Sequence, residues 1–71
     1  MPADAQRVWR LRKRHQWVDA RIDVDGGDVR LKLLLNGQLT YERRWPTREE
    51  AVAEATSRRA ELERHGWAEH W

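Results

Sequence analysis

The stretch from Val8 to Trp17 holds the side chains whose chemistry is most suggestive, because it interleaves arginines with two tryptophans. A guanidinium binds phosphate or guanine through paired hydrogen bonds, and an indole ring can stack on an unpaired base. Such a stretch can bind nucleic acid, or it can be a solvated strand whose charges only keep the protein soluble. The distinction depends on which of its side chains share a surface.

The length of 71 residues indicates one domain. A chain this short buries only about 60% of the surface that its unfolded form exposes, too little for two cores. There is no cysteine, so neither a disulfide nor a thiolate metal site is expected. The start lacks a basic segment followed by an apolar run, and the longest apolar run is Leu33-Leu34-Leu35. We therefore expect no signal peptide, no membrane partner and a cytoplasmic protein.

Charge is divided unevenly along the chain. Residues 7–45 carry ten Lys or Arg and five Asp or Glu, whereas residues 46–71 carry four and six. An asymmetry of this kind can indicate a surface that binds a polyanion. It can also reflect nothing more than a general preference for arginine.

The first half of the chain has a period of two, which is typical of half-buried strands. Around Gly26-Gly27, which suit the positive φ angles of a two-residue hairpin turn, the strands predict a definite register. Val24 faces Val29, Ile22 faces Leu31 and Asp23 faces Arg30. Apolar residues meet apolar ones and an acid meets a base, so the register is self-consistent.

A two-residue turn at His15-Gln16 extends the same sheet towards the N-terminus. It places Trp9 and Leu11 on the core side, with Arg12 opposite Asp19 and Arg10 opposite Arg21. The remaining side chains of the strand are predicted on the other face: Val8, Arg10, Arg12 and Arg14.

The hairpin at Asn36-Gly37 admits two registers. A two-residue turn puts Thr40, Glu42 and Arg44 on the core face, and a three-residue loop with Gly37 in the left-handed bulge position puts Leu39, Tyr41 and Trp45 there. Burying Glu42 without a partner would cost several kcal/mol, which favours the three-residue loop. If the two-residue turn forms instead, the open face gains Leu39, Tyr41 and Arg43.

A helix follows from about residue 48 to residue 65. Thr47 is suited to cap its N-terminus, with Glu50 completing a capping box, and Gly66 is suited to end it in a Schellman motif. That motif pairs Leu62 with Trp67.

The predicted fold class is therefore α+β, a four-stranded antiparallel meander with one C-terminal helix packed on one face. The expected strands are residues 8–14, 17–25, 28–35 and 38–45, followed by the helix at 48–65 and an aromatic tail at 66–71. One helix covers one face of the sheet, so the other face is open.

The open face is the candidate site, and we expect it to bind DNA or RNA. It also carries Arg44, Asp19, Asp23, Glu42 and Leu34. Arginines there would contact phosphate and Trp17 would stack on a base. The candidate nucleic-acid-binding residues are Arg10, Arg12, Arg14, Trp17, Arg21, Arg30 and Lys32.

The alternative is a protein-interaction module or homodimer in which the basic face is only solvated. Exposed ion pairs contribute little to stability, so they can persist without any binding function. An edge strand, either Arg7–Arg14 or Leu39–Trp45, could pair with another chain. An exposed Trp71 would also favour a partner.

The sequence offers little of what a catalytic site or a metal site requires. Ser57 has no histidine within a helical turn, and the acidic hairpin at Asp25–Asp28 departs from a calcium loop. His65, Glu69 and His70 could meet at a metal only after rearrangement of the tail. We expect no enzyme activity, no metal, no cofactor and no small-molecule substrate.

The segments Gln16–Ile22 and Trp45–Ala55 carry a resemblance. They resemble the AP2/ERF domains and the arm-type DNA-binding domains of phage integrases, which combine a strand bearing tryptophan and basic residues with a Thr-capped helix. The likeness covers roughly residues 9–62, and it implies that the sheet enters the DNA major groove. On that reading Arg12, Arg14, Trp17, Arg21 and Arg30 face the DNA. Those domains have three strands, and Arg43-Arg44 stand where they commonly have a glycine. Small bacterial proteins made of a sheet and one helix look similar too.

Overall fold

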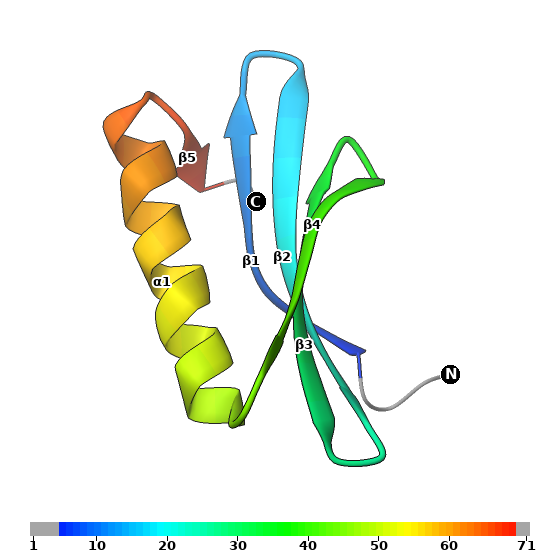
Figure 1. Ribbon diagram of the computed structural model, residues 1–71. Coiled ribbons are helices and arrows are strands. Elements are labelled where there is room, and N and C mark those ends of the chain that lie inside the picture. The colour runs from blue at the N-terminus through cyan, green and yellow to red at the C-terminus, as the bar shows by residue number, and fades with distance from the viewer. Residues whose placement is uncertain (1–4, 70–71) are drawn as a thin grey trace.

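The computed structural model describes residues 5–69 and contains one antiparallel sheet and one helix (Figure 1). The elements are β1 (Ala5–Lys13), β2 (Gln16–Asp25), β3 (Asp28–Leu35), β4 (Gln38–Trp45), α1 (Arg48–Arg64) and β5 (Ala68–Glu69). The sheet order is β4-β3-β2-β1-β5. The predicted α+β fold with four meandering strands and one helix is confirmed, and the two-residue β5 is an addition to it.

The β2–β3 hairpin has the predicted turn and register. Gly26 and Gly27 adopt φ angles of 56° and 94°, in the region that residues with a side chain rarely enter. Val24 pairs with Val29, Ile22 with Leu31 and Asp23 with Arg30. Because glycines occupy both turn positions, no other position of the turn in this segment is equally favourable.

The predicted register of the β1–β2 hairpin is wrong by two residues. Arg14 and His15 form the turn, so Arg10, not Arg12, lies opposite Asp19, and Trp17 lies opposite Arg12. A shift of two residues keeps each side chain on its face, so Trp9 and Leu11 are core residues as predicted.

A β-bulge at Val8 breaks the pairing of β1 with β2. Val8 has no partner in the register, and its side chain packs against the core instead of lying on the open face as expected. Beyond the bulge, Arg7 lies opposite Arg21, the position predicted for Arg10.

The β3–β4 hairpin combines the two registers considered for it. Asn36 and Gly37 form a two-residue turn with φ angles of 52° and 85°, and a bulge at Thr40 then shifts the register. Tyr41 and Trp45 therefore pack against the core as predicted, whereas the prediction that Leu39 does so is wrong. Leu39 precedes the bulge, pairs with Leu34 and is 48% exposed.

Both ends of α1 follow the predicted caps. The Thr47 side chain accepts a hydrogen bond from the Glu50 amide at 3.2 Å. At the other end the amide of Trp67 donates to the Leu62 carbonyl at 3.1 Å, and Gly66 adopts a φ of 95°. These are the bonds of a Schellman motif, and they turn the chain back towards β1.

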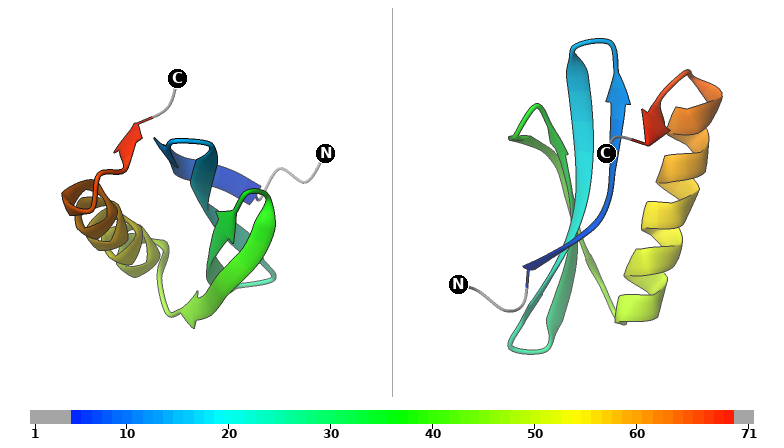
Figure 2. Two further views of the ribbon diagram at one scale, coloured as in Figure 1. Left: turned by 90° about the horizontal axis from the view of Figure 1, so that it is seen from above. Right: turned by 180° about the vertical axis from the view of Figure 1, so that it is seen from behind.

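The core lies between α1 and one face of the sheet (Figure 2). Ala51 and Ala55 are fully buried, which lets the helix backbone approach the strands closely. The buried Trp9 indole donates its Nε1–H to the Ala55 carbonyl at 2.8 Å, so the bulkiest core side chain also bonds the helix to β1. In Figure 2 no element of the described chain covers the opposite face.

The tail covers part of one sheet edge. β5 pairs with β1 at Leu11 and Arg12, so the edge expected along Arg7–Arg14 is closed there. β4 stays an edge strand of the described sheet, and its bulge and arginines are features that oppose pairing with another chain. Trp71 lies outside the described residues. The only helix in residues 5–69 is too short and polar to cross a membrane.

Candidate functional site

The predicted site residues gather on or beside the open face of the sheet. Arg10, Arg12, Trp17, Arg21, Arg30 and Lys32 alternate with core residues along β1, β2 and β3. Arg14 lies in the turn between β1 and β2 instead of on a strand. The same face carries Arg7, Arg44, Asp19, Asp23, Asp28 and Glu42. Basic and acidic side chains therefore share the face, and they form several local charge clusters instead of one uniformly basic surface.

Asp19 and Arg10 form the best-defined cluster. Arg10 donates from Nε to Asp19 Oδ1 and from Nη2 to Oδ2, the second bond at 3.0 Å, while Arg21 Nη2 lies 3.8 Å from Oδ2. Asp19 is only 2% exposed although it lies on the uncovered face. The hydrogen bonds from Arg10 hold the Asp19 pKa below its ordinary value, with smaller contributions from the charges of Arg21 and Arg7.

This pair gives the protein an acid-sensitive element. Because the Asp19 pKa is lowered in the folded state, its stabilising contribution is present above the unfolded value, about 3.9, and is lost as pH falls through the folded value. We expect stability measured by urea unfolding to fall below about pH 4, and to fall less steeply in Asp19→Asn, which has no carboxylate to titrate there. Identical pH profiles for the two proteins would contradict the pairing.

The half of the face near the β2–β3 turn is also internally paired. Lys32 Nζ bonds to Asp23 Oδ2. Arg30 Nη1 lies 3.5 Å from Glu42 Oε2, and Arg44 Nη1 lies 3.7 Å from Asp28 Oδ1. Each of these cations has a carboxylate beside it, which offsets the attraction for an external anion.

The cations at the β1–β2 hairpin have a different environment. Within the described chain, no carboxylate oxygen lies within 4.0 Å of the charged nitrogens of Arg12, Lys13 or Arg14. Arg12 Nε donates to the Arg14 carbonyl at 3.1 Å, which leaves its charge without a compensating anion. The hairpin end of the face therefore carries arginine charge that no carboxylate of the described chain offsets. Arg7, near the other end of β1, is a further cation of the face with no carboxylate oxygen of the described chain within 4.0 Å.

Trp17 stands beside Arg12 on a fixed backbone. Its amide donates to the Asn36 side chain at 3.0 Å, and its carbonyl accepts from the Asn36 amide at 2.8 Å. Trp17 is 38% exposed, and with Arg10, Arg12 and His15 it lines a hollow of about 290 Å³. The arrangement offers an aromatic surface next to guanidinium groups, at a position that the β3–β4 turn holds in place.

Sequence reasoning missed several residues of this region. Arg7 reaches the open face only because of the bulge at Val8, for which the sequence carries no turn signal. The sequence predicts His15 in a turn and Trp67 in the tail and gives no role to Lys13, yet all three line the hairpin end. The correct turn position, Arg14-His15, would have placed Lys13 and His15 at this end, and Trp67 comes there because β5 pairs with β1.

No family model, curated protein or solved structure matches this chain. The resemblance to AP2/ERF and integrase arm-type domains therefore stays a prediction. In residues 5–69 no three His, Asp or Glu side chains are grouped to ligate a metal. The suggested cluster of His65, Glu69 and His70 extends outside the described residues.

Proposed function

We propose that this protein is a small nucleic-acid-binding domain whose binding site is the hairpin end of its open sheet face. One observation carries the proposal: the exposed Trp17 pairs with Arg12 and lines a hollow with it, and no carboxylate oxygen of the described chain lies within 4.0 Å of the Arg12 guanidinium. Cations of this kind bind phosphate, and an indole on a fixed backbone can stack on a base. Arg10 belongs to the same hollow, but Asp19 already occupies its guanidinium.

The backbone of Arg14 adds support. Its φ of 57° is a conformation that glycine adopts easily and residues with a Cβ adopt at a cost. A turn selected for stability alone would favour glycine or asparagine there. An arginine at a strained position is understandable if its charge is needed for binding.

The remaining predicted residues have a secondary role in this proposal. Arg21, Arg30 and Lys32 raise the potential along the face, but each lies within 4.0 Å of an acidic side chain. We expect them to attract a polyanion at a distance and to contribute less to close contacts.

The experiment is a fluorescence-anisotropy titration of labelled oligonucleotides at about 50 mM and about 200 mM salt. If Arg12, Lys13 and Arg14 each neutralise one phosphate, affinity should fall roughly 20- to 40-fold between the two salt concentrations, because each phosphate contributes about −0.7 to −0.9 to the slope. Failure of every oligonucleotide to bind at the lower salt concentration would rule the proposal out.

A matched pair of variants locates the site on the face. Arg12→Gln should reduce the salt slope by about 0.7 to 0.9. Arg44→Gln makes the same change at the other end of the same face, where Asp28 is close, and should leave the slope nearly unchanged. Equal effects of the two would indicate diffuse attraction by the whole face.

A protein-interaction module or homodimer is the second candidate. It is favoured by Leu39, which is 48% exposed and pairs with Leu34 on the open face. Light scattering over a dilution series tests for self-association, and a monomer at all concentrations would exclude the homodimer.

A further inference from the structure

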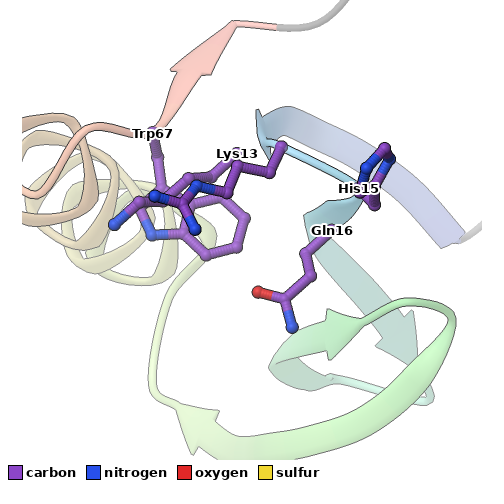
Figure 3. A pocket seen from close by; sticks show the side chains of 5 residues that line it. Lys13, His15, Gln16 and Trp67 are labelled. Carbon is purple, nitrogen blue, oxygen red and sulfur yellow. The ribbon is translucent and has the colours of Figure 1, made fainter.

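A second hollow lies on the opposite side of the β1–β2 hairpin, where the chain leaves α1 (Figure 3). Its volume is about 570 Å³, and Lys13, Arg14, His15, Gln16 and Trp67 line it. Figure 3 shows Lys13 and Trp67 together on the helix side, with His15 and Gln16 coming from the hairpin. This hollow is not part of the open sheet face, because Trp67 belongs to the segment that follows the helix.

Trp67 is fixed as firmly as Trp17. Its amide bonds to the Leu62 carbonyl at 3.1 Å, and the next residue, Ala68, pairs with Arg12 in the sheet. Its ring is half-buried, packing against the core and lining the hollow. It therefore offers a second aromatic surface whose backbone needs no rearrangement to receive a ligand.

The second hollow is positively charged. Lys13 Nζ donates to the His65 carbonyl at 2.7 Å, a contact that orients the ammonium group without neutralising it. Glu69 of the adjacent β5 is engaged by Arg59, whose Nη2 lies 3.5 Å from Glu69 Oε1. The hollow therefore places two cations beside an indole, as the hollow around Trp17 places Arg12.

The two hollows are adjacent at the hairpin. His15 lines both. Arg12 lines the hollow of Trp17, and Lys13 and Arg14 line the hollow of Trp67, so three consecutive residues at the hairpin end supply cations to both hollows. A ligand that uses both hollows must bend around the hairpin. A nucleic-acid duplex is stiff, with a persistence length of about 50 nm, and its bases are stacked on both faces, so it cannot make this bend and present bases.

We propose, resting on the nucleic-acid-binding function above, that the ligand is single-stranded and crosses the hairpin. One base stacks on Trp17 and a later base stacks on Trp67, while Arg12, Lys13 and Arg14 hold the phosphates between them. Stacking reads the ring and not the sugar, so DNA and RNA single strands both fit this site.

The test is a titration of oligo(dT) and oligo(rU) over lengths of about 2 to 10 nucleotides, within the range that one small single-strand-binding fold covers. Wild-type affinity should rise with length until the strand reaches both tryptophans. Trp67→Leu should stop the rise at a shorter length and weaken the longest oligonucleotides about fivefold or more, the loss of one stacked base. Trp17→Ala should weaken binding at every length.

A second substitution tests the same hollow in case Trp67→Leu impairs folding. Gln16 is exposed and lines only the second hollow, so Gln16→Glu places a negative charge there without disturbing the core. It should weaken long oligonucleotides only, whereas Gln38→Glu, the same change at the exposed β3–β4 hairpin, should not.

The two proposals fail differently. If no oligonucleotide of any length binds, the nucleic-acid-binding function is wrong. If oligonucleotides bind but Trp67→Leu and Gln16→Glu match wild type at every length, or a duplex binds as tightly as a single strand, the crossing of the hairpin is wrong.

Discussion

Replacing Trp9 by alanine is expected to lower the free energy of unfolding by about 3–5 kcal/mol. The side chain is 6% exposed, and its Nε1–H to Ala55 carbonyl bond of 2.8 Å is the buried polar contact between sheet and helix. A domain of this size is stabilised by only about 4–10 kcal/mol in total, so the variant should be close to unfolded. Trp9→Phe keeps most of the apolar surface and should lose less.

Trp17→Ala is the matched control, because it makes the same change on the opposite face of the sheet. Trp17 is 38% exposed, so its removal should cost about 1 kcal/mol or less. Urea unfolding followed by circular dichroism measures both without relying on tryptophan fluorescence. Similar losses from the two variants would show that the assignment of core and open faces is wrong.

Trp17→Ala should have a small effect on stability but a large effect on binding. We expect it to weaken the affinity for single-stranded oligonucleotides about 5- to 150-fold. That range corresponds to one stacked base, about 1–3 kcal/mol. Trp17→Phe keeps an aromatic ring and should recover part of the loss. Anisotropy titration at low salt gives the affinities, and a Trp17→Ala protein that binds like wild type would remove base stacking at this residue from the mechanism.

The parts of the fold that the sequence predicts well are those with a unique local signal. Gly26-Gly27 and the caps of α1 at Thr47 and Gly66 each satisfy a backbone requirement that few other residues meet. Alternation of apolar residues predicts the faces of β2, of β3 and of β1 from Trp9 onwards. These faces are correct even where the register is wrong, because the error is two residues, whereas Val8 is on the wrong face because of the bulge.

The predictions that failed lacked such a signal. Arg14-His15 carries no turn signature, since Arg14 adopts a positive φ that its residue type disfavours. The β-bulges at Val8 and Thr40 also have no signal in the sequence. The first places Arg7 on the open face, and the second returns Tyr41 to the core after the two-residue turn has placed Leu39 on the open face. The two-residue β5 is too short to show any periodicity.

These details matter more for the site than for the fold. A shift of the β1–β2 register by two residues changes which arginine pairs with Asp19. The observed partner is Arg10, and Arg12 is therefore without a carboxylate partner in the described chain. The sequence could therefore predict a basic face. It could not predict that the arginine beside Trp17, Arg12, has no carboxylate oxygen within 4.0 Å in the described chain.

The most direct test of the central claim uses the indole N–H signals of the tryptophans in a ¹H–¹⁵N correlation spectrum, followed while oligo(dT) is added. The Trp17 signal should shift, because its ring is exposed beside Arg12, whereas the Trp9 signal should stay in place, because its Nε1–H is buried against Ala55. Binding that leaves the Trp17 signal unmoved would contradict a site at the hairpin end of the open face.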